Sequence, residues 1–155
     1  MFAQYILPDY YDASIEAAVG RVILLCGQID RVLIEALKRK SNQNLDSKEA
    51  IAIVRNHKNG RGMMLGDWLE WFDKKAQEHS IDEKWIEQVS SYIKIIRPTR
   101  DRIAHDSLLL SLQGNLEWKT NQSKKLIERD HKNFEMSELV SVLDTIYKFR
   151  QFLIR

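Results

Sequence analysis

One apolar stripe near the start of the chain constrains the fold more than any other feature. Between residues 13 and 40, apolar side chains recur at alternating spacings of four and three, at Ile15, Val19, Val22, Cys26, Ile29, Leu33 and Leu37. This spacing predicts an amphipathic α-helix over residues 13–40, with Asp12 as its N-cap. The stripe is widened by further apolar residues, namely Ala18, Leu25, Val32 and Ala36. We therefore expect the helix to contact more than one other element.

The rest of the chain predicts three more main helices and one short one. The short helix covers residues 47–57, and the first main one covers residues 64–79, whose aromatic residues are expected in the core. The next helix begins after Asp82 and carries apolar residues in register as far as Ile103, although Pro98 is expected to kink or break it. Ser137 is the expected cap of the last helix, which carries apolar residues as far as Leu153.

Between the last two helices the pattern changes from helical to alternating. Leu108, Leu110 and Leu112 recur at every second position, residues 113–115 read Gln-Gly-Asn, and Leu116 and Trp118 alternate again. This pattern predicts a short β-hairpin, followed by a polar loop over residues 119–133. The predicted fold is all-α: an antiparallel four- to five-helix bundle with a small β-hairpin insertion after the helix that ends near His105. We expect one domain over residues 1–155, with residues 1–11 as an extended N-terminal arm.

Composition narrows the class of protein. A length of 155 residues suits one self-supporting domain, and a net charge of +2 is well below that of a dedicated DNA-binding domain. The single cysteine allows no internal disulfide and fits a reducing compartment. No apolar run approaches the ~20 residues of a membrane span, and the N-terminus lacks the pattern of a secretory leader. These features predict a cytoplasmic protein with no membrane partner.

The segment from Arg100 to His105, Arg-Asp-Arg-Ile-Ala-His, combines three groups that can act together on a phosphate. An arginine can hold a phosphate by paired hydrogen bonds, and a histidine can transfer protons near neutral pH. Asp101 lies four residues before His105, so its carboxylate can orient the ring. Arg100 also takes a position on the apolar stripe between Ile96 and Ile103. A guanidinium placed there needs an anionic partner or a wet cleft.

The spacing Arg100-Asp101-x-x-x-His105 resembles the R-x(4–6)-H signature of the HEPN superfamily, in which a polar residue commonly follows the arginine. The helical bundle and the place of the motif near the end of a late helix are also similar to that family. The resemblance implies a metal-independent endoribonuclease, a hydrolase that acts as a homodimer without cofactor. Two copies of the motif would form one composite cleft, and relatives often serve as toxins in toxin–antitoxin pairs or in phage defence.

The resemblance also implies a role for each residue of the motif. His105 acts as general base or acid while the RNA 2′-hydroxyl attacks the adjacent phosphate, Arg100 holds that phosphate, and Asp101 orients the ring. The products are a 2′,3′-cyclic phosphate and a 5′-hydroxyl. RNA is the expected substrate, and a partner protein that neutralises the activity is a further expected partner.

Basic residues near the motif and in two predicted loops are candidates for binding the RNA backbone. They are Arg97, Arg102, Lys58, Arg61, Lys124 and Lys125. A solvated loop is the alternative for the last four, because runs of charge usually face water. No metal site is predicted, since the histidines and Cys26 show no ligand spacing.

Two other functions remain open on the sequence. The chain can be a catalytically inactive HEPN-like module that dimerises and binds a partner protein or nucleic acid. It can also be a plain helical adaptor in which Arg100 and His105 make only structural contacts. In that case the charged residues from Arg97 to Asp106 form a solvated ladder of ion pairs.

Overall fold

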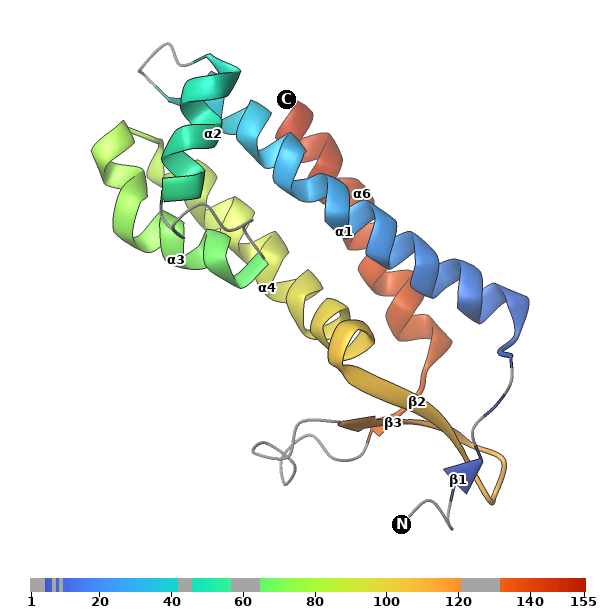
Figure 1. The fold of residues 1–155 in the computed structure, drawn as a ribbon. Coiled ribbons are helices and arrows are strands. Elements are labelled where there is room, and N and C mark those ends of the chain that lie inside the picture. Colours follow the sequence, from blue (N-terminus) through green and yellow to red (C-terminus); the bar gives the residue numbers. More distant parts are fainter. Residues whose placement is uncertain (1–4, 7, 9, 42–45, 57–64, 121–131) are drawn as a thin grey trace. The chain divides into compact units, whose positions relative to one another are not determined.

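A computed structural model describes residues 5–6, 8, 10–41, 46–56, 65–120 and 132–155 of the chain (Figure 1). The fold is mostly helical with one small antiparallel sheet. The helices are α1 (Ala13–Lys40), α2 (Ser47–Asn56), α3 (Leu65–Lys75), a 3-10 turn (Ala76–His79), α4 (Glu83–His105) and α6 (Met136–Ile154). The strands are β1 (Tyr5–Ile6), β2 (Asp106–Ser111), β3 (Leu116–Thr120) and β4 (Lys132–Asn133). The helical class expected from the sequence is confirmed.

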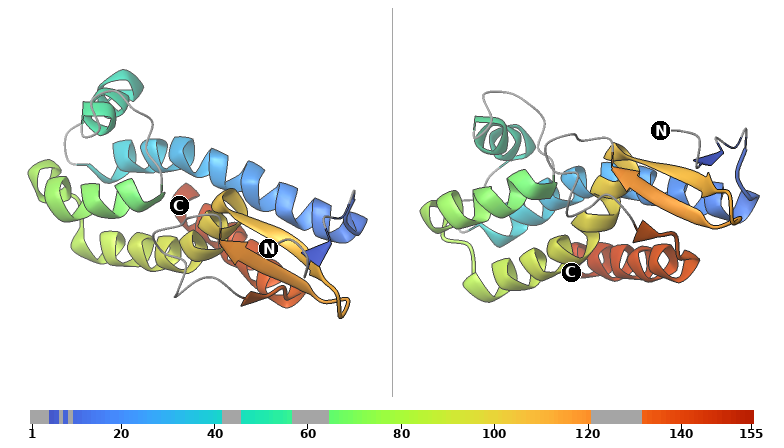
Figure 2. Two further views of the ribbon diagram at one scale, coloured as in Figure 1. Left: turned by 60° about the horizontal axis from the view of Figure 1, so that its bottom comes forward. Right: turned by 90° about the horizontal axis from the view of Figure 1, so that it is seen from below.

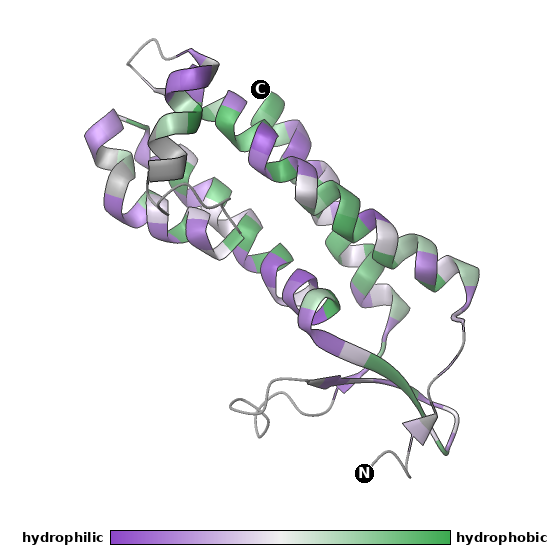
Figure 3. Cartoon of the chain, viewed as in Figure 1, coloured by the Kyte–Doolittle hydropathy of each residue, from purple (hydrophilic) through white to green (hydrophobic). Residues whose placement is uncertain are grey.

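Helix α1 follows the predicted stripe closely. It begins at Ala13, and the Asp12 carboxylate accepts a hydrogen bond from the backbone N–H of Ser14 at 2.8 Å, as an N-cap does. Val22, Ile29 and Leu33 are fully buried. Figure 3 shows hydrophobic and hydrophilic residues alternating along α1, as one buried face requires.

The chain forms two compact units, each described separately below. One contains residues 1–23 and 98–143, and the other contains residues 24–97 and 144–155. The motif from Arg100 to His105 therefore belongs to the first unit.

An aromatic cluster forms the core of the unit made of residues 24–97 and 144–155. Trp68, Trp71 and Phe72 of α3 pack on one another with ring centroids 5.5 to 6.1 Å apart, and Trp85 of α4 meets Phe72 edge-on at 6.0 Å. All four side chains are buried, so the expectation that these aromatic residues fill the core is confirmed. Offset and edge-on arrangements of this kind are the favourable ones for aromatic rings.

A buried tryptophan ties α1 to α3 in the same unit. The indole N–H of Trp68 donates to the carboxylate of Asp30 at 2.5 Å. Burial raises the pKa of Asp30, the Trp68 hydrogen bond opposes that rise, and the nearby carboxylate of Asp67 adds to it. The sequence analysis did not predict this contact, because the position of Asp30 beside the apolar stripe does not show whether another side chain binds it.

The helices of this unit do not all alternate in direction. The segments of α1 and α6 run the same way, and α4 runs opposite to both (Figures 1 and 2). The guanidinium of Arg39, near the end of α1, donates to the backbone carbonyl of Leu153, near the end of α6. The ring of Tyr92 on α4 stacks on that of Phe149 on α6 at 5.0 Å. The prediction of an antiparallel bundle therefore holds for α4 but is wrong for the pair α1 and α6.

The unit made of residues 1–23 and 98–143 contains the sheet, with strand order β1-β2-β3-β4 and antiparallel pairing throughout. β2 and β3 form the predicted hairpin, in which Leu108 lies opposite Trp118 and both are buried. Gly114 has φ +88°, a conformation that glycine adopts without strain, and it allows the chain to reverse there. The hydroxyl of Tyr11 donates to the carbonyl of Leu108 at 2.5 Å and holds the segment before α1 against β2.

Four details of the sequence prediction are corrected. Strands β1 and β4 lie in segments expected to be an extended arm and a loop, where no strand was predicted; each is only two residues long, too short to show a periodic pattern. Pro98 does not break α4, which continues to His105, since a proline removes one helical hydrogen bond and the turns on either side keep theirs; the alternative of a kink stays a prediction. Helix α6 begins at Met136 instead of after Ser137. Leu112 is exposed in the hairpin turn, because β2 ends at Ser111.

Candidate functional site

The last two turns of α4 carry the predicted catalytic residues. Arg100 and Asp101 lie within the helix, and His105 is its final residue. β2 begins at the next position, Asp106, so no loop separates the histidine from the sheet. The side chain of His105 is exposed. A proton-transfer group at this place can reach a ligand in solvent.

Arg100 and Asp101 form an ion pair, with 3.2 Å between Nη1 of the guanidinium and Oδ1 of the carboxylate. Their side chains are 28% and 27% exposed, so the pair lies at the surface and only partly shielded. A guanidinium carries five N–H donors, and one contact with Asp101 does not exhaust them. The arrangement can hold an anion and the carboxylate at once.

Asp101 and His105 lie on the same side of α4, because the helix is unbroken between them and residues four apart are neighbours on a helix surface. Asp101 accepts from Arg100, as described above. Its proposed second role, the orientation of the His105 ring, stays a prediction.

Arg100 follows Ile93 and Ile96 on the same face of α4 by helical spacing, as the sequence predicts, but it is less buried than they are. Ile93 and Ile96 are fully buried, and the next buried position along the helix is Thr99. Arg100 follows it and is half-buried, and Ile103 is half-buried as well. Since Ile103 on the same stripe is half-buried too, the lower burial belongs to this end of the helix and not to Arg100 alone. The half-buried position lets the guanidinium reach solvent.

Arg102 and Asp106 form a second ion pair of a different kind. The distance from Nη1 to Oδ2 is 3.2 Å, and the side chains are 13% and 1% exposed. Nη1 of Arg102 and Oδ2 of Asp106 are both buried, and they form an ion pair without the geometry of a hydrogen bond. The pair joins the last turn of α4 to the first residue of β2 and brackets His105. Arg102, predicted to contact RNA, is thus the most buried of the motif's charged residues and has a partner within its own unit.

Arg97 lies in the other compact unit and has a distinct environment. Its guanidinium lies against the backbone of Gly66, in the first turn of α3. A Cβ atom on Gly66 would be only 2.9 Å from Cζ and 3.0 Å from Nη2 of Arg97. Any side chain at position 66 would displace the guanidinium, so glycine is what allows this contact.

The remaining predicted RNA-binding residues, Lys58, Arg61, Lys124 and Lys125, lie outside the described residues. Among the residues that the structure describes, no group of three or more His, Cys, Asp or Glu side chains is placed to bind a metal ion. No described helix is long and apolar enough to cross a membrane.

Sequence reasoning missed the buried character of the Arg102–Asp106 pair. The two residues were recognised as members of a charged ladder, and their spacing of four was visible. The available signal was the start of an apolar strand directly after Asp106, which places the carboxylate at the edge of a core.

Comparisons of the chain with protein-family models, curated proteins and solved structures found no match.

Proposed function

We propose that this protein is a metal-independent endoribonuclease of HEPN type. The observation that carries the proposal is the grouping of Arg100, Asp101 and His105 on the last two turns of α4, with the imidazole exposed and the guanidinium half-exposed. A phosphate-binding cation and a proton-transfer group on the same two turns of a helix supply the minimum that RNA transesterification requires.

The proposed reaction needs only these side chains and the RNA itself. His105 removes the proton from a 2′-hydroxyl, whose oxygen attacks the adjacent phosphorus and displaces the 5′-oxygen of the next nucleotide. The displaced oxygen takes up a proton from a second, protonated His105 of the homodimer or from water, and the products are a 2′,3′-cyclic phosphate and a 5′-hydroxyl. Arg100 stabilises the charge that builds on the phosphate oxygens in the transition state. A homodimer would supply a second copy of each group, and the cytoplasm is the proposed compartment.

Cleavage of a fluorescently labelled RNA tests the proposal. Arg100→Ala and His105→Ala are expected to lower the rate by at least about a hundredfold, the typical contribution of one acid–base or oxyanion-stabilising group. The exposed Arg21 of α1 offers a matched control, and Arg21→Ala should cleave like wild type. An RNA with a single 2′-deoxy nucleotide should resist cleavage at that position, and a chelator should have no effect. Unchanged cleavage by folded His105→Ala would refute the proposal.

The Arg100–Asp101 contact favours one alternative function. A guanidinium that already pairs with a carboxylate has part of its charge compensated, which suits binding better than transition-state stabilisation. In this alternative the chain is a catalytically inactive HEPN-like module that dimerises and binds a partner protein or nucleic acid. Retained RNA affinity with no product, in wild type and in His105→Ala alike, would establish it. A monomer in sedimentation at micromolar concentration would argue against both HEPN-type functions and favour the plain adaptor.

A further inference from the structure

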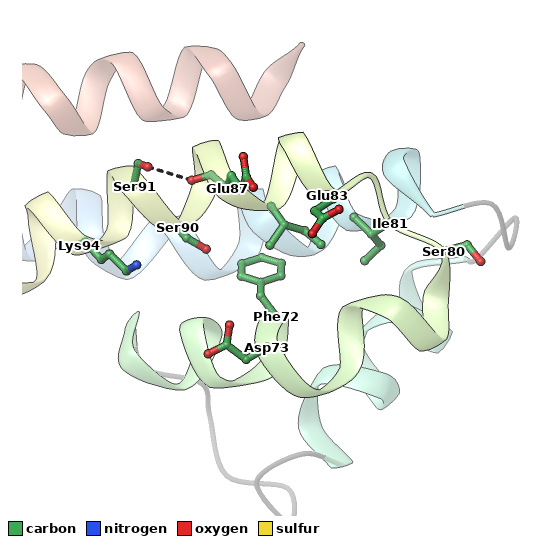
Figure 4. Close-up of a pocket in the computed structure, with 10 residues that line it drawn as sticks. Phe72, Asp73, Ser80, Ile81, Glu83, Glu87, Ser90, Ser91 and Lys94 are labelled. Atoms are coloured by element: carbon green, nitrogen blue, oxygen red, sulfur yellow. Dashed lines mark hydrogen bonds between the residues drawn. The ribbon is translucent and has the colours of Figure 1, made fainter.

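A half-open cavity of about 770 Å³ lies between α3 and α4, in the unit that does not contain the motif (Figure 4). Phe72 and Asp73 line it from α3, and Ser80 and Ile81 line it from the segment before α4. The remaining lining residues all belong to the first three turns of α4. We refer to this cavity as the α3–α4 groove.

The wall of the groove is a second, polar stripe on α4. Glu83, Glu87, Ser90 and Lys94 follow one another at spacings of four, three and four, which keeps them on one side of the helix. The buried residues of the same stretch occupy the other side, at Trp85, Val89 and Ile93. From Glu83 to Lys94 the stripe is about 16 Å long, at a rise of 1.5 Å per residue. The groove is therefore bordered by a straight edge three helical turns long.

The floor of the groove is apolar. The ring of Phe72 points from α3 toward α4 (Figure 4), and Phe72 and Ile81 are buried. Ile86 is half-buried and also lines the groove. A helix laid in the groove can place apolar side chains against these residues and bury more of Ile86.

The charge of the groove is opposite in sign to that of the chain. Among the described residues that line it are three carboxylates, of Asp73, Glu83 and Glu87, and one ammonium, of Lys94, whereas the whole chain carries +2. Two of the carboxylates belong to the first two turns of α4, and Lys94 is at the far end of the stripe. This pattern repels a phosphate backbone over most of its length and attracts lysine and arginine side chains. An RNA is therefore a poor occupant, and a basic segment of a protein is a good one.

We propose that the α3–α4 groove docks an amphipathic helix of a partner protein. The apolar face of that helix contacts Phe72, Ile81 and Ile86, and its lysine or arginine side chains face Asp73, Glu83 and Glu87. An acidic side chain about three turns away meets Lys94, which fixes the direction of the docked helix. The inference rests on the lining of the groove alone, so it stands or falls independently of the proposed ribonuclease activity.

The test uses the full chain and a phage-displayed library of helical peptides of about sixteen residues, long enough to span the stripe. Peptides selected against wild type are expected to be amphipathic and rich in lysine and arginine. The best of them, labelled for fluorescence anisotropy, should bind Glu83→Gln/Glu87→Gln at least about tenfold more weakly than wild type. Glu35→Gln, which removes an exposed carboxylate of α1, is the matched control and should bind like wild type. Raising the salt from about 50 to about 300 mM should also weaken binding.

A second variant guards against misfolding of the first. Ser90→Arg places a cation in the groove, and it should weaken peptide binding while circular dichroism stays that of wild type. Selection of neutral or acidic peptides, or of none at all, would overturn the proposal, as would equal affinity for wild type and Glu83→Gln/Glu87→Gln. Two other results would also overturn it by assigning the groove to a different occupant. In the first, wild type is a dimer and Glu83→Gln/Glu87→Gln is a monomer. In the second, a labelled RNA binds Glu83→Gln/Glu87→Gln more weakly than it binds wild type.

Discussion

The buried ion pair between Arg102 and Asp106 allows a quantitative prediction of stability. Arg102→Met removes the guanidinium that lies 3.2 Å from the carboxylate of Asp106, a side chain only 1% exposed. Loss of one member of a buried pair typically costs about 3–5 kcal/mol, because the remaining charge stays in a place that water barely reaches. A chain of this size has a total stability of about 5–15 kcal/mol, so the loss is a large part of the whole.

The expected change is measurable by two routes. Urea denaturation, followed by circular dichroism and tryptophan fluorescence, should show a lower midpoint with the same slope. Thermal unfolding should show a Tm lower by about 6–20 °C, since each kcal/mol shifts the Tm by about 2–4 °C at this chain length. Glu70→Gln breaks an exposed pair of the same i, i+4 spacing, with Lys74 at 2.9 Å, and should cost no more than about 0.5 kcal/mol.

A double variant separates the charge from the packing. Arg102→Met/Asp106→Leu replaces both charges with apolar side chains, and such replacements are often neutral or stabilising. It should therefore be more stable than either single variant. A cost below about 1 kcal/mol for Arg102→Met would refute the reasoning, because it is the value of a solvated surface pair. A double variant that loses the sum of the two single losses would refute it as well.

Three other predictions follow from contacts of single side chains. Asp30→Asn should make the protein more stable at pH 7, because burial raises the pKa of Asp30. The folded state therefore binds the proton of the Asp30 carboxyl more tightly than the unfolded state does. The resulting stabilisation is complete below 3.8, the ordinary pKa, and it is lost as the pH rises through the raised pKa of the folded state. The advantage of the variant in urea denaturation should accordingly shrink toward pH 3, while its amide oxygen still accepts from Trp68. Gly66→Ala should stabilise the protein by about 1 kcal/mol in an Arg97→Ala background, since alanine favours a helix, and by less in wild type, where the added Cβ meets the guanidinium; equal effects in both backgrounds would contradict the contact. Asp46→Ala should cost about 1 kcal/mol in the same assay, because the Asp46 carboxylate accepts from the first turn of α2 at 2.8 Å, and no loss would exclude that capping role.

The parts of the fold that the sequence predicts are those set by local periodicity. The stripe of α1, the aromatic face of α3 and the alternation of the hairpin each repeat several times within one segment, and each is found in the structure. Strands β1 and β4 could not be predicted this way. Tyr5 pairs with Ser111, more than a hundred residues away, and two residues are too few to show a period.

The predicted site shows the same division between local and tertiary information. The sequence places Arg100, Asp101 and His105 within two turns of one helix, and α4 keeps them there. It does not distinguish the half-exposed Arg100–Asp101 pair from the buried Arg102–Asp106 pair, because exposure depends on what packs over the helix end. The α3–α4 groove is invisible for the same reason, since its lining comes from two helices and the segment between them.

The buried pair also bears on the choice between the two HEPN-type functions. His105 lies between Arg102 and Asp106, at a junction where helix passes directly into strand, so its backbone is fixed on both sides. A general base must be held close to its productive position, whereas a binding contact tolerates small displacements. In a ribonuclease, Arg102→Met/Asp106→Leu should therefore lower kcat while KM stays near that of wild type, provided that the variant remains folded. In a binding module, the same variant should leave the RNA affinity unchanged, with no turnover before or after the substitution. A ribonuclease whose kcat is unaffected by loss of this pair would show that the junction does not position the histidine.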